Sequence, residues 1–276
     1  MVGEVVELLS GCHLVLDLTV GAGGHSEALL RSGVDRVVGL DRDPEAVRSA
    51  RERLRTFGDR ARVVEARFSE LDEVAVFEGV DGVLYDLGLS SMQVDQAQRG
   101  FSYRQDAPLD MRMGSEGPTA ADLVNTLSER DLADLIYRYG EERRSRQVAS
   151  AIVRRRPILS TDQLAGVVVS AVGRRPGGPH PARRTFQALR IAVNREIEEL
   201  TASLPQAAGL LVPGGRVVAI SYHSSEDGLV KRAFRDDARL RVLTRSPMRP
   251  SAGEVARNRR ARSAKLRAAE RIAEAA

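Results

Sequence analysis

A glycine loop flanked by acidic side chains is the first set of residues whose types and spacing could do chemistry. The string DLTVGAGGHS places Gly21, Gly23 and Gly24 after an apolar run and before a helical stretch. Glycines let backbone N–H groups approach a nucleotide without an intervening Cβ. A dinucleotide-binding loop would carry a third glycine where this chain has Ser26. Asp17 would repel a pyrophosphate and suit an ammonium group, so these residues favour S-adenosylmethionine over NAD.

Two further side chains could contact such a cofactor. Asp41 ends the run RVVGLD, from which a carboxylate can accept hydrogen bonds from both ribose hydroxyls. The alternative is that Asp41 only caps the helix that follows it. Phe68 follows the third apolar run and could cover an adenine ring. An isolated aromatic of this kind is more often part of the core.

Alternating strands and helices must position these residues. Helical stretches separate four short apolar runs, which predict parallel strands over 13–18, 36–41, 61–66 and 81–86. This order is typical of an α/β fold with a doubly wound, mostly parallel sheet. A fifth strand is predicted over 216–222, introduced by the turn LVPGG. The long stretch before it exceeds what a βαβ crossover needs, so it predicts an inserted helical domain.

The predicted boundaries assign residues 1–112 and 186–276 to a discontinuous sheet domain and 113–185 to the insert. Thr119 and Ser128 are candidate N-caps of helices in the insert. The clearest helix is predicted over 183–204, where apolar residues follow a 3-4-4-3-4 spacing.

Charge is unevenly distributed along the 276 residues. The net charge is +4, yet residues from 229 onward carry 14 Lys or Arg against 5 Asp or Glu. A basic tail of this kind indicates nucleic-acid binding, or alternatively a solvated helix or a disordered end. Apolar runs are too short to span a bilayer, and no secretory signal is evident. A cytoplasmic protein without membrane contact is expected, and four scattered histidines with one cysteine predict no metal site.

The segment after the fourth strand, DLGLSSMQVDQAQRGFSYRQDAPLDMRM, is too polar for a simple connector. It resembles the ribosomal small-subunit RNA cytosine-N4 methyltransferase family, also called MraW or RsmH. The resemblance continues through HPARRTFQALRIAVNREIEEL, LVPGGRVVAISYHSSEDGLVK and RARSAKLRAAER, and so covers nearly the whole chain.

The resemblance implies a class I methyltransferase fold with an inserted helical domain. The implied activity is methyl transfer from S-adenosylmethionine to the exocyclic N4 amine of a cytidine in the decoding region of 16S rRNA, within the small ribosomal subunit. Carried over by matching positions, the implied cofactor contacts are Gly23, Gly24, His25, Asp41, Phe68, Asp86 and Gln93.

The chain departs from the family pattern at several positions. Members usually begin with an extended segment containing His and Pro-Val, whereas this sequence starts at Met1 without it. Met92 and Arg259 each stand where proline is usual, and Tyr222 stands where phenylalanine is common. A non-catalytic rRNA-binding assembly factor with a methyltransferase-like fold is therefore the alternative function, and an NAD oxidoreductase is a more distant one.

A cytosine amine is a poor nucleophile because its lone pair is delocalised, so acceptors for its hydrogens and accurate positioning are needed. Candidates are Asp110 in PLDMRM and His223 in SYHSSED. Asp110 could instead cap a helix or pair with Arg112, and His223 could be a structural histidine. Methylation at carbon 5 would need a thiolate, and Cys12, the only cysteine, precedes the first strand.

RNA contacts are expected from basic and aromatic side chains, because base-modifying enzymes bind an unstacked base beside a cationic surface. The basic candidates are Arg183, Arg184 and Arg190 of the insert and Arg257, Arg259, Arg260, Arg262, Lys265 and Arg267 of the tail. The aromatic candidates for stacking are Phe101, Tyr103 and Tyr222.

Overall fold

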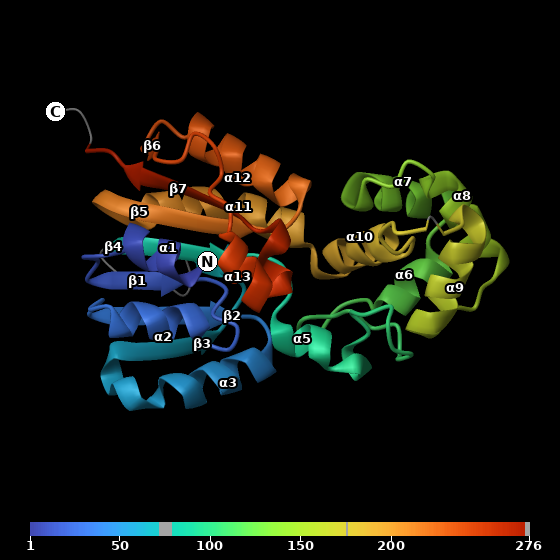
Figure 1. Ribbon diagram of the computed structural model, residues 1–276, viewed down its shortest axis with the longest axis horizontal. Coiled ribbons are helices and arrows are strands. Elements are labelled where there is room, and N and C mark those ends of the chain that lie inside the picture. Colours follow the sequence, from blue (N-terminus) through green and yellow to red (C-terminus); the bar gives the residue numbers. More distant parts are fainter. Residues whose placement is uncertain (72–78, 175, 274–276) are drawn as a thin grey trace. The chain divides into compact units, whose positions relative to one another are not determined.

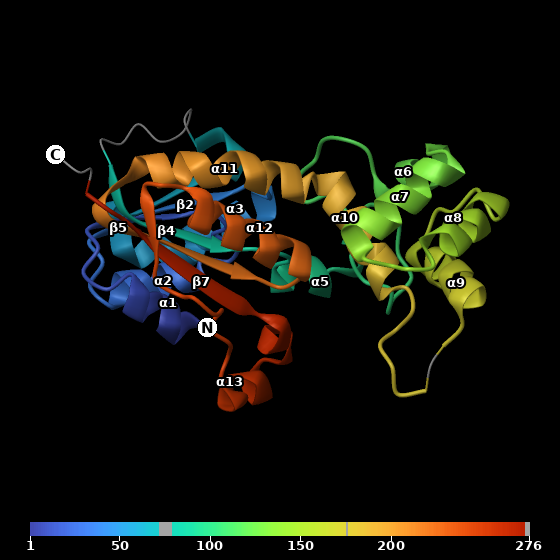
Figure 2. The same ribbon diagram turned by 90° about the horizontal axis from the view of Figure 1, so that it is seen from above.

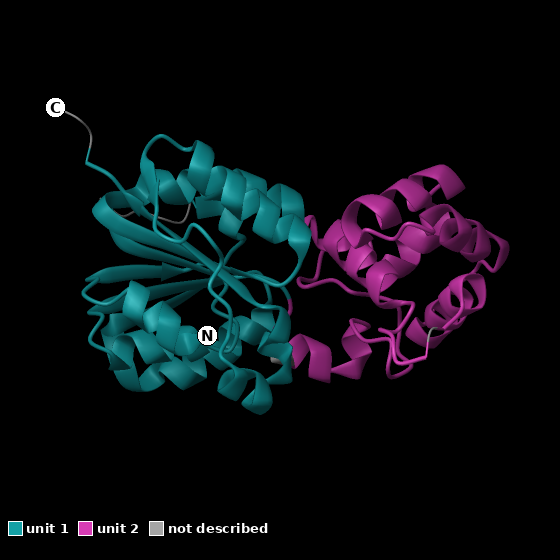
Figure 3. Ribbon diagram, turned by 45° about the horizontal axis from the view of Figure 1, so that its top comes forward, with its two compact units in different colours: residues 1–88, 197–276 teal, residues 89–196 magenta. Residues whose placement is uncertain are grey.

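The computed structural model describes residues 1–71, 79–174 and 176–273. The chain forms two compact units, which are residues 1–88 with 197–276, and residues 89–196 (Figure 3). These boundaries differ from the predicted ones, because 89–112 and 186–196 belong to the second unit. Phe101, Leu109 and Met111 on one side and Leu189 and Val193 on the other share a core with the insert helices. Hydrophobic packing therefore extends the helical unit in both directions along the chain.

The first unit contains a seven-stranded sheet in the order β3-β2-β1-β4-β5-β7-β6 (Figure 1). Strands β1 to β5 pair in parallel, whereas β7 runs antiparallel to both β5 and β6. The strands are β1 Leu14–Asp17, β2 Arg36–Asp41, β3 Ala61–Glu65, β4 Val80–Asp86, β5 Leu211–Ser221, β6 Leu240–Val242 and β7 Lys265–Arg271. This arrangement confirms the predicted class I methyltransferase fold, and all five predicted strands are present.

Helices cover both faces of this sheet because consecutive strand residues point to opposite sides. Val15 packs in one apolar cluster with residues of the first helices, and its neighbour Leu16 packs in the other with Leu200 and Phe234. Figures 1 and 2 show the helices of the two layers. They are α1 Val2–Leu8, α2 Gly24–Arg31 and α3 Pro44–Leu54 on one face, and α11 Glu196–Leu210 and α12 Ser224–Asp236 on the other.

Short elements complete the first unit around the chain termini and loops. They are α13 Ala252–Arg257 and the 3-10 helices η1 Arg55–Arg60, η2 Phe68–Glu70 and η4 Arg259–Ser263. The motif LVPGG, predicted as a turn before the fifth strand, instead lies inside β5. There the register with β4 shifts between Val80 and Gly82, and Gly214 adopts a φ of 83°. An irregular strand thus replaces the expected turn.

The second unit is helical and has its own apolar core. Its elements are α5 Ser91–Asp95, η3 Ala97–Arg99, α6 Ala120–Thr126, α7 Glu129–Gly140, α8 Ser145–Arg154, α9 Thr161–Val172 and α10 Arg183–Asn194. The predicted N-caps are confirmed, because the side chain of Thr119 accepts from Asp122 N and that of Ser128 from Asp131 N. No helix in the described part of the chain has both the length and the apolar character to cross a membrane.

The single helix predicted over 183–204 is wrong. The helix is interrupted at Arg195, whose φ of 52° and ψ of 36° lie in the left-handed region. As a result α10 ends at Asn194 and α11 begins at Glu196. The apolar spacing continues across the break, which is why the periodicity predicted one helix. The break marks the end of the helical unit, and the two halves of the pattern bury their apolar faces in different cores.

Candidate functional site

The first glycine loop is held by a buried carboxylate under it. Asp17, at the end of β1, is 1% exposed and accepts hydrogen bonds from Ser26 Oγ at 2.7 Å and Thr19 N at 3.3 Å. Burial raises the pKa of Asp17, although the hydrogen bond from Ser26 and the charge of His25 lower it. Asp17 is therefore a buried support of the turn, whereas the sequence analysis assigned it to an ammonium group of the ligand. Ser26, which stands where a dinucleotide-binding loop has its third glycine, supplies the hydroxyl of this hydrogen bond.

Asp41 joins the loop to the end of β2. Its Oδ2 accepts from Gly21 N at 3.0 Å and its Oδ1 from Asp43 N at 2.9 Å. Asp43, not Asp41, is the N-cap of α3, because its side chain accepts from Glu45 N. The helix-capping interpretation therefore belongs to Asp43. Burial raises the pKa of Asp41 to about 6, since the two backbone donors offset only part of the lost solvation.

Close packing fixes the path of the loop. A Cβ at Gly39 on β2 would lie 2.6 Å from Val20 Cγ2, so glycine lets the loop lie directly on the strand. Gly23 has a φ of 79° and abuts α3, with Ala50 Cα 3.4 Å from the position of a Cβ. At Gly24 the nearest neighbour would be only the end of the Arg53 side chain at 3.5 Å. The loop thus packs against β2 at Gly39 and against α3 at Gly23. At Gly24 only the flexible end of a side chain lies nearby.

Asp86, at the end of β4, is the centre of a polar cluster that joins three elements. Its backbone N donates to Thr19 Oγ1 at 2.6 Å, Tyr222 Oη donates to its Oδ1 at 2.9 Å, and His25 Nε2 lies 3.4 Å from its Oδ2. Burial lowers the pKa of His25, but the hydrogen bond and charge of Asp86 outweigh it and leave the net pKa above its ordinary value. The sequence predicted His25 and Asp86 but missed this use of Tyr222.

The remaining two predicted cofactor residues have different surroundings. Phe68 is half-buried in η2 and packs edge-on against Tyr85, with ring centroids 5.9 Å apart. Gln93 belongs to the second unit, where it is 5% exposed on α5. Its Oε1 accepts from Ser90 N at 3.0 Å, and Ser90 Oγ accepts from Gln93 N at 3.2 Å. The amide oxygen of Gln93 is therefore part of a capping box.

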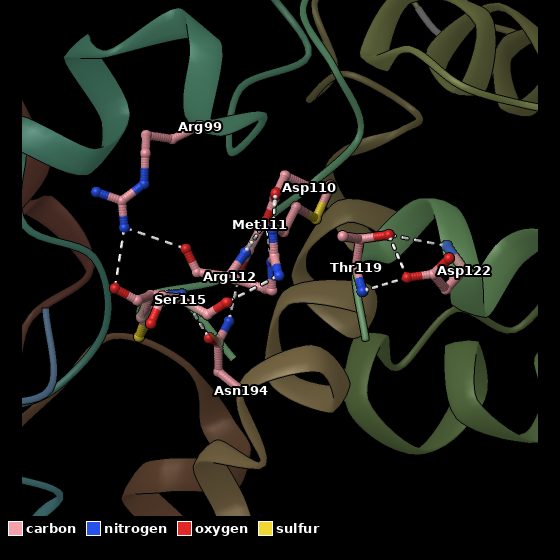
Figure 4. Close-up of polar contacts among 9 residues, drawn as sticks. Arg99, Asp110, Met111, Arg112, Ser115, Thr119, Asp122 and Asn194 are labelled. Carbon is pink, nitrogen blue, oxygen red and sulfur yellow. Dashed lines mark hydrogen bonds and ion pairs between the residues drawn. The ribbon is translucent and has the colours of Figure 1, made fainter. Parts of the chain in front are cut away.

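Asp110 lies in the second unit and pairs with Arg112 (Figure 4). Arg112 Nε donates to its Oδ1 at 2.8 Å and Nη2 to its Oδ2 at 2.7 Å, and Arg112 N donates to Oδ1 at 2.9 Å. These hydrogen bonds hold the pKa of Asp110 below its ordinary value. The carboxylate keeps 30% exposure. Asp110 is thus an ionised, oriented acceptor that solvent still reaches.

Two residues that the sequence analysis missed hold this loop in place. Asn194 is 1% exposed, and its amide accepts from Met113 N and donates to Met111 O, both at 2.8 Å. Arg99 Nη2 donates to the carbonyls of Arg112 and Met113 at 3.1 and 3.0 Å (Figure 4). This bracing fixes a backbone in which Met111 has a φ of 62°. No sequence signal pointed to this role of Asn194, because it lies in the middle of the single helix predicted over 183–204.

His223 is the N-cap of α12 in the first unit. Its Nδ1 accepts from Glu226 N at 3.4 Å, and its Nε2 lies 2.9 Å from Glu226 Oε1. Glu226 is itself 2% exposed and accepts from Tyr222 N at 2.9 Å. Nδ1 thus serves the N-cap, whereas Nε2 lies beside the Glu226 carboxylate and makes no hydrogen bond within the described residues.

Cys12 is poorly suited to act as a thiolate nucleophile. It packs with Leu9 and Val15 at the amino-terminal side of β1, whereas the polar cluster lies at the carboxyl ends of the strands. Burial raises the pKa of its thiol to about 11. This supports the sequence argument against methylation at carbon 5.

Several basic residues predicted to contact RNA are engaged in ion pairs. Arg190 binds Glu196 through two contacts of 2.8 Å, and Arg184 lies 3.7 Å from Glu142. In β7, Lys265 and Arg267 both pair with Asp227 of α12, at 3.0 and 2.7 Å. Within the described part of the tail, β7 is a strand between β5 and β6, whereas α13 is a short, solvent-exposed helix as the alternative expected.

The donor set at the carboxyl edge of the sheet fits S-adenosylmethionine. Each carboxylate oxygen of Asp41 accepts one backbone hydrogen bond and retains a second acceptor site for a ribose hydroxyl. His25 Nδ1 is buried without a hydrogen-bond partner in the described residues. Near Gly24 the closest group to the position of a Cβ is the flexible end of the Arg53 side chain, so the backbone there can approach a ligand. These features belong to the first unit alone.

Comparison with known proteins gives the family. A model described as the MraW methylase family matches residues 1–272. A ribosomal RNA small subunit methyltransferase H of Gloeobacter violaceus is 53% identical and covers 94% of this chain and 82% of its own length. Proteins of the same name from Methylorubrum extorquens and Afipia carboxidovorans are 48% identical and cover 94% and 99% of this chain, and 81% and 89% of their own lengths. The chain therefore belongs to the MraW methylase family.

Proposed function

We propose that this chain transfers a methyl group from S-adenosylmethionine to the exocyclic N4 amine of a cytidine in the decoding region of 16S rRNA. The observation that carries this function is the identity of about half, over at least 94% of the chain, with ribosomal RNA small subunit methyltransferases. We further propose that the substrate is the RNA within the small ribosomal subunit. An enzyme with that substrate acts in the cytoplasm.

S-adenosylmethionine supplies an electrophilic methyl group on a sulfonium. Asp41 is proposed to accept hydrogen bonds from the ribose hydroxyls, and Phe68 to contact the adenine. Gly23 and Gly24 provide backbone N–H groups, while the cluster of Asp86 and His25 places a carboxylate where a cationic group can be held. Gln93 is proposed as a further contact from the second unit, based on the family resemblance.

Asp110 is the better candidate for accepting a hydrogen of the cytosine amine. Its carboxylate is ionised, held by Arg112 and 30% exposed, so it can orient an amine without first losing a proton. Taking an N–H hydrogen bond directs the nitrogen lone pair and stabilises positive charge that develops on nitrogen during transfer. His223 keeps both ring nitrogens toward Glu226, and we propose that it positions the end of β5.

The reaction is tested with isotopically labelled S-adenosylmethionine and small subunits from a strain lacking the endogenous enzyme, followed by nucleoside mass spectrometry. Label is expected in N4-methylcytidine, and protein-free 16S rRNA is expected to be a poorer substrate than the subunit. Label in another nucleoside would overturn the base assignment. Absence of label despite cofactor binding would favour the non-catalytic assembly factor.

The roles of Asp110 and Asp41 are separable by variants. Asp110→Asn should lower kcat on the order of 10²-fold and leave the Kd for S-adenosylmethionine unchanged.

Asp41→Asn should raise the Kd for S-adenosylmethionine. Because the pKa of Asp41 is about 6, wild-type affinity should fall as the pH drops below 6 and the carboxyl becomes protonated. Calorimetry across pH 5 to 8 should show this dependence in the wild type and not in Asp41→Asn.

A further inference from the structure

A pocket of about 570 Å³ opens on the surface of the helical unit. Its wall is formed by Tyr103, Arg104, Arg174, Pro179, His180 and Arg183. This volume falls within the ~300–1,000 Å³ range of small-ligand pockets. All six of these described lining residues belong to the second unit.

Three guanidinium groups give the pocket its charge. In the part of the chain that the structure describes, no carboxylate lies within 4.0 Å of Arg104, Arg174 or Arg183. Other arginines of the same unit differ, because Arg112 and Arg190 each bind a carboxylate through two contacts. Among the described residues, the pocket thus gathers positive charge without a paired carboxylate. Guanidinium groups match the geometry of phosphate oxygens.

An ordered aromatic pair forms another part of the wall. Tyr103 stacks on His180, with ring centroids 4.5 Å apart and an interplanar angle of 11°. Phe186 of the unit's core packs edge-on against Tyr103, with centroids 5.5 Å apart and an angle of 85°. His180 Nδ1 accepts from Ala182 N at 3.2 Å, which leaves Nε2 as the donor of a neutral ring. Burial and the charge of Arg174 lower the pKa of His180 and favour that neutral form.

We infer that this pocket binds one nucleotide of single-stranded RNA, with the phosphate on Arg104, Arg174 and Arg183 and the base against the Tyr103–His180 pair. The inference rests on the proposed function for the identity of the polyanion. Phosphate-binding arginines beside stacked aromatic rings are the chemistry by which proteins hold unpaired RNA. A simple anion site would need the arginines but not the ordered aromatic pair.

The test uses a fluorescein-labelled single-stranded RNA of about 12 nucleotides, titrated with full-length protein over a range of salt. The pocket variant combines Arg104→Ala, Arg174→Ala and Arg183→Ala. The matched control combines Arg130→Ala, Arg138→Ala and Arg155→Ala, which removes three exposed charges from the same unit outside the pocket. Loss of the one phosphate contact should reduce the slope of log affinity against log salt by about 0.7 in the pocket variant.

The aromatic contribution is tested separately. His180→Ala should weaken RNA binding on the order of tenfold with little change in the salt slope, because stacking does not release counterions. Heparin serves as a polyanion without bases, and its affinity should depend on the arginines but not on His180. Equal loss for RNA and heparin in His180→Ala would overturn the nucleotide assignment. An acidic peptide that competes as well as RNA would instead indicate a protein partner and also overturn it.

Failure of this inference and failure of the proposed function give different results. If the pocket and control variants have equal RNA affinities and equal salt slopes while the wild type methylates small subunits, the pocket inference is wrong. If the wild type shows no methylation but the pocket variant still loses RNA binding, the proposed reaction is wrong and the pocket stands. Urea midpoints equal to the wild type's will show that both triple variants are folded.

Discussion

Two groups of basic residues in this chain carry similar charge and have opposite surroundings. Arg267 and Lys265 of β7 share Asp227 inside the first unit, and Arg267 is 7% exposed. Arg104 and Arg183 of the pocket lie on the surface of the helical unit with no carboxylate partner in the described residues. Charge density along the sequence therefore identifies neither group as a binding surface, because pairing across strands and helices decides which cations remain available.

The largest effect is expected from removing the shared carboxylate of β7. Asp227→Ala leaves Arg267 buried without its counterion, which should lower the free energy of unfolding by about 3 kcal/mol. Urea denaturation measured by circular dichroism checks this value. A loss that is much smaller would mean that the C-terminal cations are as available as those of the pocket, and the contrast between the two groups would disappear.

A crossed pair of substitutions separates structure from binding. Arg267→Met should cost about 2 kcal/mol of unfolding free energy and leave the salt dependence of RNA binding unchanged. Arg183→Met should leave the urea midpoint unchanged and reduce the salt slope by less than about 0.7, the value for one whole phosphate contact with a single strand, because Arg104 and Arg174 still face the phosphate. Methionine keeps an unbranched stem at both sites, so mainly the charge is altered. The reverse pattern in either variant would break the comparison.

The ion pair of β7 should also appear in the pH dependence of stability. Burial raises the pKa of Asp227, but Arg267 and Lys265 outweigh this and hold it below its ordinary value. A carboxyl with a lowered folded pKa stabilises the protein above its unfolded pKa of about 3.9, and that contribution is lost as the pH falls through the folded pKa. The stability difference between wild type and Asp227→Ala should therefore shrink from pH 7 to pH 3. An unchanged difference at both pH values would argue against the ionised pair.

The smallest effect is expected at the other end of the same helix. Asp236 pairs with Arg235 at 2.7 Å, but both side chains are exposed, at 58% and 61%. Solvent screens such a pair, so Asp236→Ala should not measurably change the urea midpoint. This variant is the matched control for Asp227→Ala, since both remove an aspartate from α12. A comparable loss in the two variants would show that α12 is sensitive to any lost charge.

Sequence patterns predicted the parts of this protein that depend on local order. The apolar runs ending at Asp17, Asp41 and Asp86 became β1, β2 and β4, because alternation of side chains and helical spacing are properties of the chain itself. The glycine loop could also be predicted from the sequence, since a tight turn next to a strand favours glycine. The family resemblance added His25 and Gln93, for which no local pattern argued.

Tertiary structure alone decided how far the helical unit extends and which residues form hydrogen bonds and ion pairs with each other. The apolar spacing from Phe186 to Leu204 is continuous, yet the break at Arg195 sends its two halves into separate cores. Asp17 reads as a ligand group in sequence, but burial beside Ser26 makes it a support of the loop. Partners such as Tyr222 and Asp86 are 136 residues apart. Contacts over such separations leave no periodic trace in the sequence, so the sequence alone could identify the kinds of residues present but not their pairing.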